Sequence, residues 1–191
     1  MTGASDLSLP RARSIVLVGL MGAGKTSVGR RLATALELPF RDSDEEVERA
    51  AGRTVSEIFA TLGEAEFRDG ERRVIARLLS GPPQVLATGG GAFMNPETRA
   101  LIAQKAVSVW LRADTEVLLR RVGRKTDRPL LREGDPRAVL EALGAQRNPV
   151  YAQADIVVDS AETPHAATVQ AIIAALRAHA GGETAKSQAA P

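Results

Sequence analysis

Short apolar runs alternate along this chain with longer segments in which apolar residues recur at helical spacing. The runs are rich in Val, Ile and Leu and stop at glycine or polar residues; they cover residues 14–18, 84–87, 106–111 and 155–158, with a weaker run at 38–41. Runs that are apolar on both faces suit the central strands of a parallel sheet. We therefore expect each run to form a strand.

The segments between the runs predict helices. The longest should hold two or three helices, interrupted near Gly52 and Gly63; the segments are residues 25–36, 44–80, 96–104, 115–122, 136–154 and 164–180. Pro96, Pro136 and Pro164 each stand where a helix could begin, because the first turn does not need the N–H that proline lacks. The alternation of strand and helix predicts an α/β fold with helices on both faces of the sheet.

The two ends of the chain lack this pattern. Residues 1–13 are polar, and residues 181–191 are small and polar without an apolar face, so we expect flexible tails around one domain at residues 14–180. No apolar run reaches the roughly 18 residues that a membrane-spanning helix needs, and residues 1–13 lack the apolar segment of a secretory signal. The default expectation is a cytoplasmic protein with no membrane partner.

The amino-acid composition excludes several kinds of functional site. The 191 residues include no cysteine and two histidines, which excludes a disulfide scaffold, a thiolate metal site and a metal site of three histidines. A net charge of +2, from 25 basic and 23 acidic residues, gives no support to a nucleic-acid partner. With only six aromatic residues, the core must be built mainly from Ala, Leu, Val and Ile.

The strongest functional signal is the loop GLMGAGKT at residues 19–26. It fits the phosphate-binding pattern G-x-x-x-x-G-K-[ST] and stands between a predicted strand and a predicted helix, as that pattern requires. Its glycines let backbone N–H groups surround an anion, and the helix N-terminus adds partial positive charge. In this pattern Lys25 reaches the β- and γ-phosphates and the Thr26 hydroxyl binds Mg²⁺. The loop predicts binding of a nucleoside triphosphate.

Three weaker signals each have a structural alternative. Asp42 and Asp44 follow the second predicted strand, where ligands collect in parallel sheets, but Ser43 or Asp44 could instead cap a helix. Residues 88–91 (TGGG) could offer bare backbone N–H groups to a ligand or form a flexible turn. Residues 120–131 form a basic loop that could be a lid over the triphosphate or a solvated connection.

Together these motifs resemble those of the shikimate kinases, a family of small bacterial P-loop kinases. The likeness covers about residues 14–180 and rests, in order, on GLMGAGKTSVGRRLA, FRDSD, EAEFRDGE, TGGGA, RPLL and RNPVY. The likeness assigns a functional role to Arg68 and Arg147, although a single arginine without a local motif is typically a surface residue or an ion-pair partner. The combination is specific, whereas any piece other than the phosphate loop is weak alone.

The resemblance implies an ATP-dependent enzyme that transfers the γ-phosphate to the 3-hydroxyl of shikimate, in the aromatic amino-acid pathway, with one Mg²⁺ ion. It implies a three-layer α/β P-loop fold with a five-stranded parallel sheet of order 2-3-1-4-5. It also implies a mobile lid at about residues 122–135 and a monomer whose partners are ATP and shikimate.

The resemblance further assigns residues to the nucleotide and the metal ion. Arg121 would lie against adenine and Arg128, in the lid, would reach the phosphates; the full nucleotide set is Gly22, Ala23, Gly24, Lys25, Thr26, Ser27, Arg121 and Arg128. Thr26 would bind Mg²⁺ directly, and Asp42 would act on it through water. Thr26 replaces the more frequent serine and keeps the hydroxyl, while Thr88 stands where many P-loop proteins have an aspartate.

For shikimate, the resemblance implies that Arg68 and Arg147 bind the carboxylate, which suits the planar fork of arginine. Asp44 would hold the reacting hydroxyl, and the backbones of Gly89, Gly90 and Gly91 would complete the pocket. Phe59 and Phe67 could line the ring of the substrate or simply belong to the core. The catalytic residues would be Lys25, Asp44 and Arg128.

The expected role of Asp44 follows from ordinary carboxylate chemistry. An aspartate with a pKa of about 3.9 is a weak base at neutral pH, and phosphoryl transfer needs little push from the nucleophile. We therefore expect Asp44 to orient the hydroxyl and accept its proton late, while Mg²⁺, Lys25 and Arg128 neutralise charge.

Two other functions stay open. A gluconate kinase would share the phosphate loop and the lid but would not explain Arg68 and Arg147 beside the three glycines. A non-catalytic module that senses nucleotides would not account for Asp42, Asp44 and the arginines of the lid.

Overall fold

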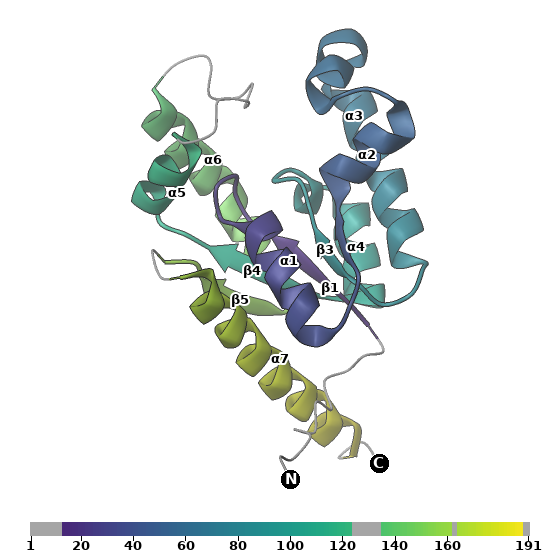
Figure 1. Ribbon diagram of the computed structural model, residues 1–191, viewed down its shortest axis with the longest axis vertical. Coiled ribbons are helices and arrows are strands. Elements are labelled where there is room, and N and C mark those ends of the chain that lie inside the picture. Colours follow the sequence, from purple (N-terminus) through teal and green to yellow (C-terminus); the bar gives the residue numbers. More distant parts are fainter. Residues whose placement is uncertain (1–12, 124–134, 162–163, 189–191) are drawn as a thin grey trace.

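The computed structural model describes residues 13–123, 135–161 and 164–188. Within them the chain forms one five-stranded parallel sheet of order β2-β3-β1-β4-β5 (Figure 1). The strands are β1 Ser14–Val18, β2 Phe40–Asp42, β3 Val85–Ala87, β4 Ala106–Arg112 and β5 Ile156–Asp159. The predicted strands and the sheet order are confirmed. Arg128 and most of the predicted lid lie outside the described residues.

Helices cover both faces of this sheet, as the alternating pattern predicts (Figure 1). Helices α1 and α7 pack together on one face, while α4 and the second half of α3 pack on the other. The helices are α1 Lys25–Leu36, α2 Ser43–Ala51, α3 Val55–Leu79, the 3₁₀ helix η1 Ala92–Met94, α4 Pro96–Lys105, α5 Thr115–Val122, α6 Pro136–Tyr151 and α7 His165–Gln188.

The long segment at residues 44–80 forms α2 and α3, with breaks at the two predicted glycines. Gly52 ends α2 at a φ of 63°, and Gly63 kinks α3 at a φ of 83°, in the left-handed region that favours glycine. Between them, Thr54 and Glu57 form a reciprocal capping box that starts α3. Helix α7 continues to Gln188, past the end expected at residue 180.

The core is aliphatic and centres on β1, whose five residues are all buried. Strand β5 departs from the expectation that both faces are apolar, because it lies at the edge of the sheet. Val157 is 43% exposed, and Asp159 forms an ion pair with Arg112 of β4, with a shortest N–O distance of 2.6 Å. Within the described residues, no helix has both the length and the apolar character that crossing a membrane requires.

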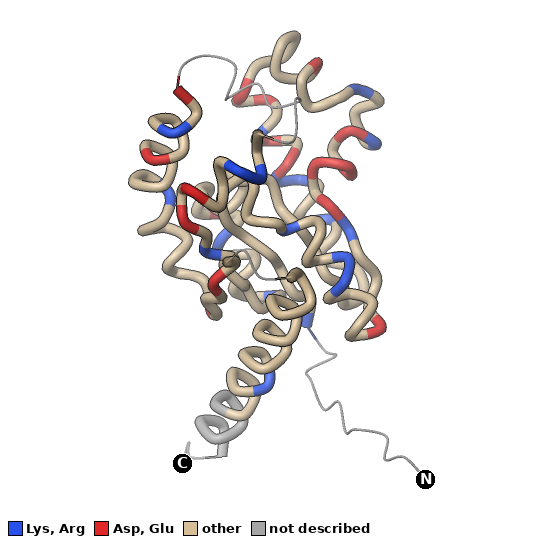
Figure 2. The backbone as a smooth tube through the Cα atoms, turned by 60° about the vertical axis from the view of Figure 1, so that its left-hand side comes forward, with Lys and Arg blue, Asp and Glu red and all other residues tan. Residues whose placement is uncertain are grey.

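The parallel register brings the predicted functional segments to one edge. Ala87 of β3 pairs with Leu17 of β1 and with Asp42 of β2. The three strands therefore end side by side, and the loops that follow them meet at the carboxyl edge of the sheet. Both acidic and basic residues lie on the neighbouring α2 and α3, where several form ion pairs within and between the two helices; Figure 2 shows how charged residues are distributed along the backbone.

Candidate active site

The phosphate loop joins β1 to α1 and depends on glycine at three positions. Gly19, Gly22 and Gly24 have φ values of 137°, 82° and 92°, which side-chain-bearing residues rarely adopt. A Cβ atom on Gly19 would also lie 2.6 Å from the carbonyl oxygen of Leu111. The Lys25 ammonium donates to the carbonyl oxygens of Gly19 and Leu20, at 2.8 and 2.9 Å. Lys25 therefore lies over the loop that it would serve.

Asp42 links the phosphate loop to α2. Its Oδ2 accepts a hydrogen bond from the Thr26 hydroxyl at 2.8 Å, and its Oδ1 accepts one from the backbone N–H of Asp44 at 3.1 Å. The cap of α2 is therefore Asp42, not Ser43 or Asp44 as the alternative interpretation proposed. Capping uses one oxygen only, so the two interpretations of this acidic pair are compatible.

Thr26 and Asp42 together fit a magnesium ion. A hydroxyl and a nearly buried carboxylate, in contact beside a phosphate loop, are the oxygen ligands that Mg²⁺ prefers. Within the described residues, no cluster of three His, Cys, Asp or Glu side chains could hold a metal ion. Mg²⁺ commonly takes one or two protein ligands and completes its shell with phosphates and water.

Asp44 is a half-buried residue in the first turn of α2. Its Oδ1 atom is buried and has no hydrogen-bond partner. Burial, and secondly the charge of Asp42, raise the pKa of Asp44 from 3.8 to about 6, although Lys25 and Arg68 oppose the rise. The expectation of an ordinary pKa is therefore wrong, and Asp44 is a better proton acceptor than the sequence suggested.

The three glycines after β3, residues 89–91, form a turn that other side chains enclose closely; we call it the glycine turn. A Cβ atom on Gly89 would lie 2.8 Å from Asp44 Oδ1, and one on Gly91 would lie 2.5 Å from the Arg68 guanidinium. One on Gly90 would lie 3.4 Å from Arg147 Nη1. Residues far apart in sequence thus meet around one turn, as expected of a single site.

Glu71 is a further residue of this site to which the sequence analysis assigned no role. Its side chain is 2% exposed, and its Oε2 atom accepts a hydrogen bond from Arg68 Nη1 at 2.8 Å. Its Oε1 atom is buried without a partner, 2.5 Å from where a Cβ of Gly89 would lie. Burial raises its pKa, against the nearby Arg68. The sequence feature that could have indicated Glu71 is its spacing from Arg68, because residues three apart lie on one face of a helix.

Arg121, at the end of α5, connects the phosphate loop to the loop after β5. Its guanidinium donates to the Ser160 hydroxyl at 2.9 Å and to the Ala161 carbonyl oxygen at 2.6 Å. The buried Ser160 hydroxyl donates in turn to the carbonyl oxygen of Ala23. Arg121 thus lies beside the phosphate loop, at the carbonyl oxygens of Gly22 and Ala23, and Ser160 is a contact that no sequence motif indicated. Ser27 lies in the first turn of α1.

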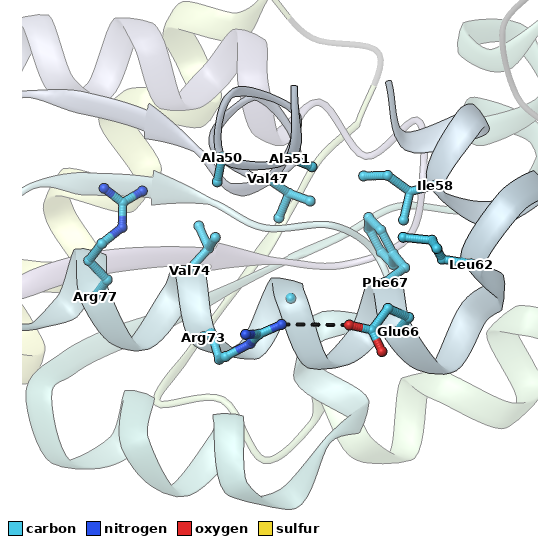
Figure 3. A pocket seen from close by; sticks show the side chains of 11 residues that line it. Val47, Ala50, Ala51, Ile58, Leu62, Glu66, Phe67, Arg73, Val74 and Arg77 are labelled. Atoms are coloured by element: carbon cyan, nitrogen blue, oxygen red, sulfur yellow. Dashed lines mark ion pairs between the residues drawn. The ribbon is translucent and has the colours of Figure 1, made fainter. Parts of the chain in front are cut away.

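Phe67 lines a separate groove between α2 and α3 (Figure 3), and Phe59 packs against its ring. The groove has a volume of about 330 Å³; Val47 of α2 and Ile58, Phe67 and Val74 of α3 form its apolar lining. The Phe67 ring is 3% exposed and packs on Phe59, with ring centroids 4.7 Å apart. Of the two interpretations that the sequence left open, the structure favours a core role for Phe67.

The family model and the relatives in sequence agree on one family. A family model described as shikimate kinase matches residues 21–177. A protein of Caulobacter vibrioides named shikimate kinase is 66% identical over 178 residues, which cover 93% of this chain and 89% of the relative. One of Bradyrhizobium diazoefficiens with the same name is 58% identical, over 95% and 88% of the two chains.

Solved structures agree in fold. A shikimate kinase from Acinetobacter baumannii, in complex with shikimate, is 40% identical; the alignment has a TM-score of 0.81 and covers 84% of this chain and 90% of that one. A gluconokinase from Sinorhizobium meliloti is 21% identical, with a TM-score of 0.65 over 94% and 99% of the two chains. That second likeness concerns the fold alone.

Proposed function

Because this chain belongs to the shikimate kinase family and is therefore an ATP-dependent kinase for shikimate, we propose that shikimate binds at the glycine turn, between Asp44, Arg68 and Arg147. The observation that carries this proposal is the enclosure of the turn by these three side chains. Two arginines and bare backbone N–H groups suit a carboxylate, while a buried aspartate suits a hydroxyl. The gluconokinase likeness gives no comparable support for gluconate.

We propose that ATP binds along the phosphate loop, with its phosphates against the N-terminus of α1. The loop glycines and the dipole of α1 favour an anion there. Lys25, which contacts the loop carbonyls, would turn to the phosphates by exchanging those neutral acceptors for charged ones. The assignments of Gly22, Ala23, Gly24, Ser27 and Arg121 to ATP belong to this proposal, as does that of Arg128.

Thr26 and Asp42 are the residues that would hold Mg²⁺, Asp42 through water. When bound, the ion would neutralise charge that develops on the transferred phosphate. Asp42 keeps one oxygen on the cap of α2, which fixes the carboxylate and leaves its second oxygen directed at Thr26.

In the proposed reaction, the 3-hydroxyl oxygen of shikimate forms a bond to the γ-phosphorus and the bond from phosphorus to the β–γ bridging oxygen breaks. The products are ADP and shikimate 3-phosphate. The hydroxyl proton passes to Asp44, whose raised pKa of about 6 suits it to receive a proton near neutral pH. Arg68, held by Glu71, binds the substrate carboxylate and so sets the direction in which the hydroxyl points.

The test is a coupled assay of ADP release with ATP and Mg²⁺, with shikimate or gluconate as acceptor. We expect release that depends on shikimate and not on gluconate. Arg147→Ala should raise the shikimate KM about 10-fold or more and leave the KM for ATP unchanged, because it removes one of two charged contacts to the carboxylate.

Arg137→Ala is the matched control for Arg147→Ala. Arg137 lies on the same helix, but it pairs with Glu116 at the surface, so both KM values should stay unchanged. An unchanged shikimate KM in Arg147→Ala would remove this residue from the carboxylate site. Release that depends on gluconate alone would overturn the acceptor.

A further inference from the structure

We propose that Tyr151 is a positioning residue for the acceptor site: it ties α6 to the glycine turn and so sets where Arg147 stands relative to Gly90. This inference rests on the proposed function, because it concerns binding of the same acceptor. Neither the phosphate loop nor the arginine pair points to Tyr151, which lies at the end of α6 and is completely buried.

The tie is a hydrogen bond from the Tyr151 hydroxyl to the backbone carbonyl oxygen of Gly90, the middle residue of the turn. Burial raises the pKa of Tyr151 to about 12, although the Arg147 and Arg68 guanidiniums oppose this rise. The hydroxyl therefore keeps its proton throughout the neutral range and stays a donor. Without it, the partly buried carbonyl group of Gly90 would lose this partner.

The Tyr151 ring holds the same region by packing. It lies 6.4 Å from the Phe93 ring, nearly parallel to it, and 5.9 Å from the Trp110 ring, measured between centroids. Phe93 is in η1, which begins directly after the glycine turn, and Trp110 is in β4. The ring thus fixes the end of α6 against the sheet, while the hydroxyl fixes the turn.

Arg147 lies four residues before Tyr151, so the two side chains project from the same face of α6. Arg147 is also close to the turn, 3.4 Å from where a Cβ of Gly90 would lie. Pro149 stands between them in the helix. Because proline has no N–H, it cannot donate to the carbonyl of Ala145, and this last turn of α6 has fewer hydrogen bonds of its own. The hydrogen bond from Tyr151 to Gly90 offsets this missing helix hydrogen bond in the turn that carries Arg147.

The experiment is Tyr151→Phe, which removes the hydroxyl and keeps the ring. We expect the shikimate KM to rise about 10-fold, equivalent to about 1.4 kcal/mol, with kcat and the KM for ATP within about twofold of the wild type. Ile172→Val is the matched control, because it trims a fully buried residue on α7. It should lower the Tm without moving either KM.

A double variant tests the connection to Arg147. If Tyr151 acts by placing Arg147, then adding Tyr151→Phe to Arg147→Ala should raise the shikimate KM by less than about twofold beyond Arg147→Ala alone. Multiplying effects would overturn the connection. An unchanged shikimate KM in folded Tyr151→Phe, or equal rises in both KM values, would overturn the positioning role. Failure of the proposed function is distinguishable, because the wild type would then show no turnover that depends on shikimate.

Discussion

Folding changes the acid–base chemistry of Asp44. Its position in the first turn of α2 buries it at the carboxyl edge of the sheet, beside Asp42, and this raises its pKa to about 6. Burial disfavours the charged form of an acid, as does a neighbouring negative charge. At neutral pH Asp44 is therefore ionised but close enough to its pKa to exchange a proton with a substrate hydroxyl.

This pKa predicts the acid limb of the pH profile. A group that must be deprotonated in the free enzyme makes kcat/KM fall as pH drops below its pKa. We expect kcat/KM for shikimate to be level above about pH 6.5 and to fall about 10-fold per pH unit below about pH 5.5. The measurement is an initial-rate profile from about pH 5 to 8 with both substrates well below their KM values, so that the rate reports the ligand-free enzyme. A rate that stays level down to about pH 5 would contradict the role of Asp44 as proton acceptor.

The raised pKa of Asp44 also predicts that ionisation of this residue lowers the stability of the fold. An acid whose folded-state pKa lies above its unfolded value binds its proton more tightly when folded, so the free energy of unfolding decreases as pH rises from about 4 to about 6. Asp44→Asn removes this cost, which is at most on the order of 3 kcal/mol. We expect Asp44→Asn to have a higher Tm than the wild type at about pH 8, by several degrees, with turnover nearly lost.

Asp69→Asn is the control for this stability effect. Asp69 lies on α3, where its ion pair with Arg72 lowers its pKa. An acid whose pKa is lowered by folding stabilises the folded state at pH values above its pKa in the unfolded chain. Removing the charge of Asp69 should therefore not raise the Tm at about pH 8. If the two variants change the Tm in the same direction, burial of Asp44 is not the cause.

We expect Lys25 to act in catalysis through the positive charge of its ammonium group. We expect Lys25→Ala to lower kcat by roughly 10²- to 10³-fold, because an aimed cation stabilises the charge of the transferred phosphate. The sequence predicts the same direction for Arg128→Ala. Single-turnover rates at saturating ATP measure the effect. A change confined to the KM for ATP would make Lys25 a binding residue only.

At the scale of elements, the glycine turn is the most constrained segment. Helix α2 brings Asp44 to it, α3 brings Arg68 and Glu71, and α6 brings Arg147 and Tyr151. At Gly89 and Gly91 a Cβ atom would lie 2.5 Å from a neighbouring side-chain atom, so that side chain would have to move. A side chain at Gly89 or Gly91 would therefore displace groups of the proposed acceptor site, apart from any contact of the turn with a ligand.

Gly89→Ala tests this constraint, and Gly70→Ala is its matched control. A methyl group on Gly89 would displace Glu71 and Asp44, so we expect the shikimate KM to rise at least about 10-fold and the Tm to fall. Gly70, inside α3, has nothing within 4 Å of the place that its methyl group would take, so Gly70→Ala should stabilise by about 0.5–1 kcal/mol and leave KM unchanged. A shikimate KM unaltered in Gly89→Ala would place the acceptor elsewhere.

At the scale of the whole molecule, the parallel sheet determines where the site lies. Strands β1, β2 and β3 end at one edge, and each is followed by a functional segment. The proposed acceptor side, on α2, α3 and α6, and the proposed nucleotide side, on α1 and α5, would therefore meet across the end of β1. Ligands that bind between such elements stabilise the fold through every element that they contact.

Ligand binding should therefore raise the thermal stability of the whole chain selectively. Shikimate at about 100 times its Kd would add about 2.7 kcal/mol, which in a protein of this size raises the Tm by about 5–10 °C. Gluconate at the same concentration should leave the Tm unchanged. Differential scanning fluorimetry distinguishes these results, and equal shifts with both acids would contradict specific recognition of the acceptor.

The local features of this protein follow from its sequence alone. Strand and helix positions, the phosphate loop and the breaks at Gly52 and Gly63 depend on periodicity and backbone preference, which act over a few residues. The order of motifs was specific enough to indicate the family and, through it, the sheet order. The structure corrects the expectation of two apolar faces for β5, where an edge position exposes Val157, and the expected end of α7.

Contacts between distant segments, in contrast, became known only from the folded chain. The pKa of Asp44 depends on burial by residues far along the chain, Asp42 caps α2 while it accepts a hydrogen bond from Thr26, and Tyr151 reaches Gly90 across 61 positions. Periodicity records which face of an element is buried but not what it is buried against. Electrostatic shifts and side-chain hydrogen bonds depend on that second fact, so they could be known only once the sheet had brought the segments together.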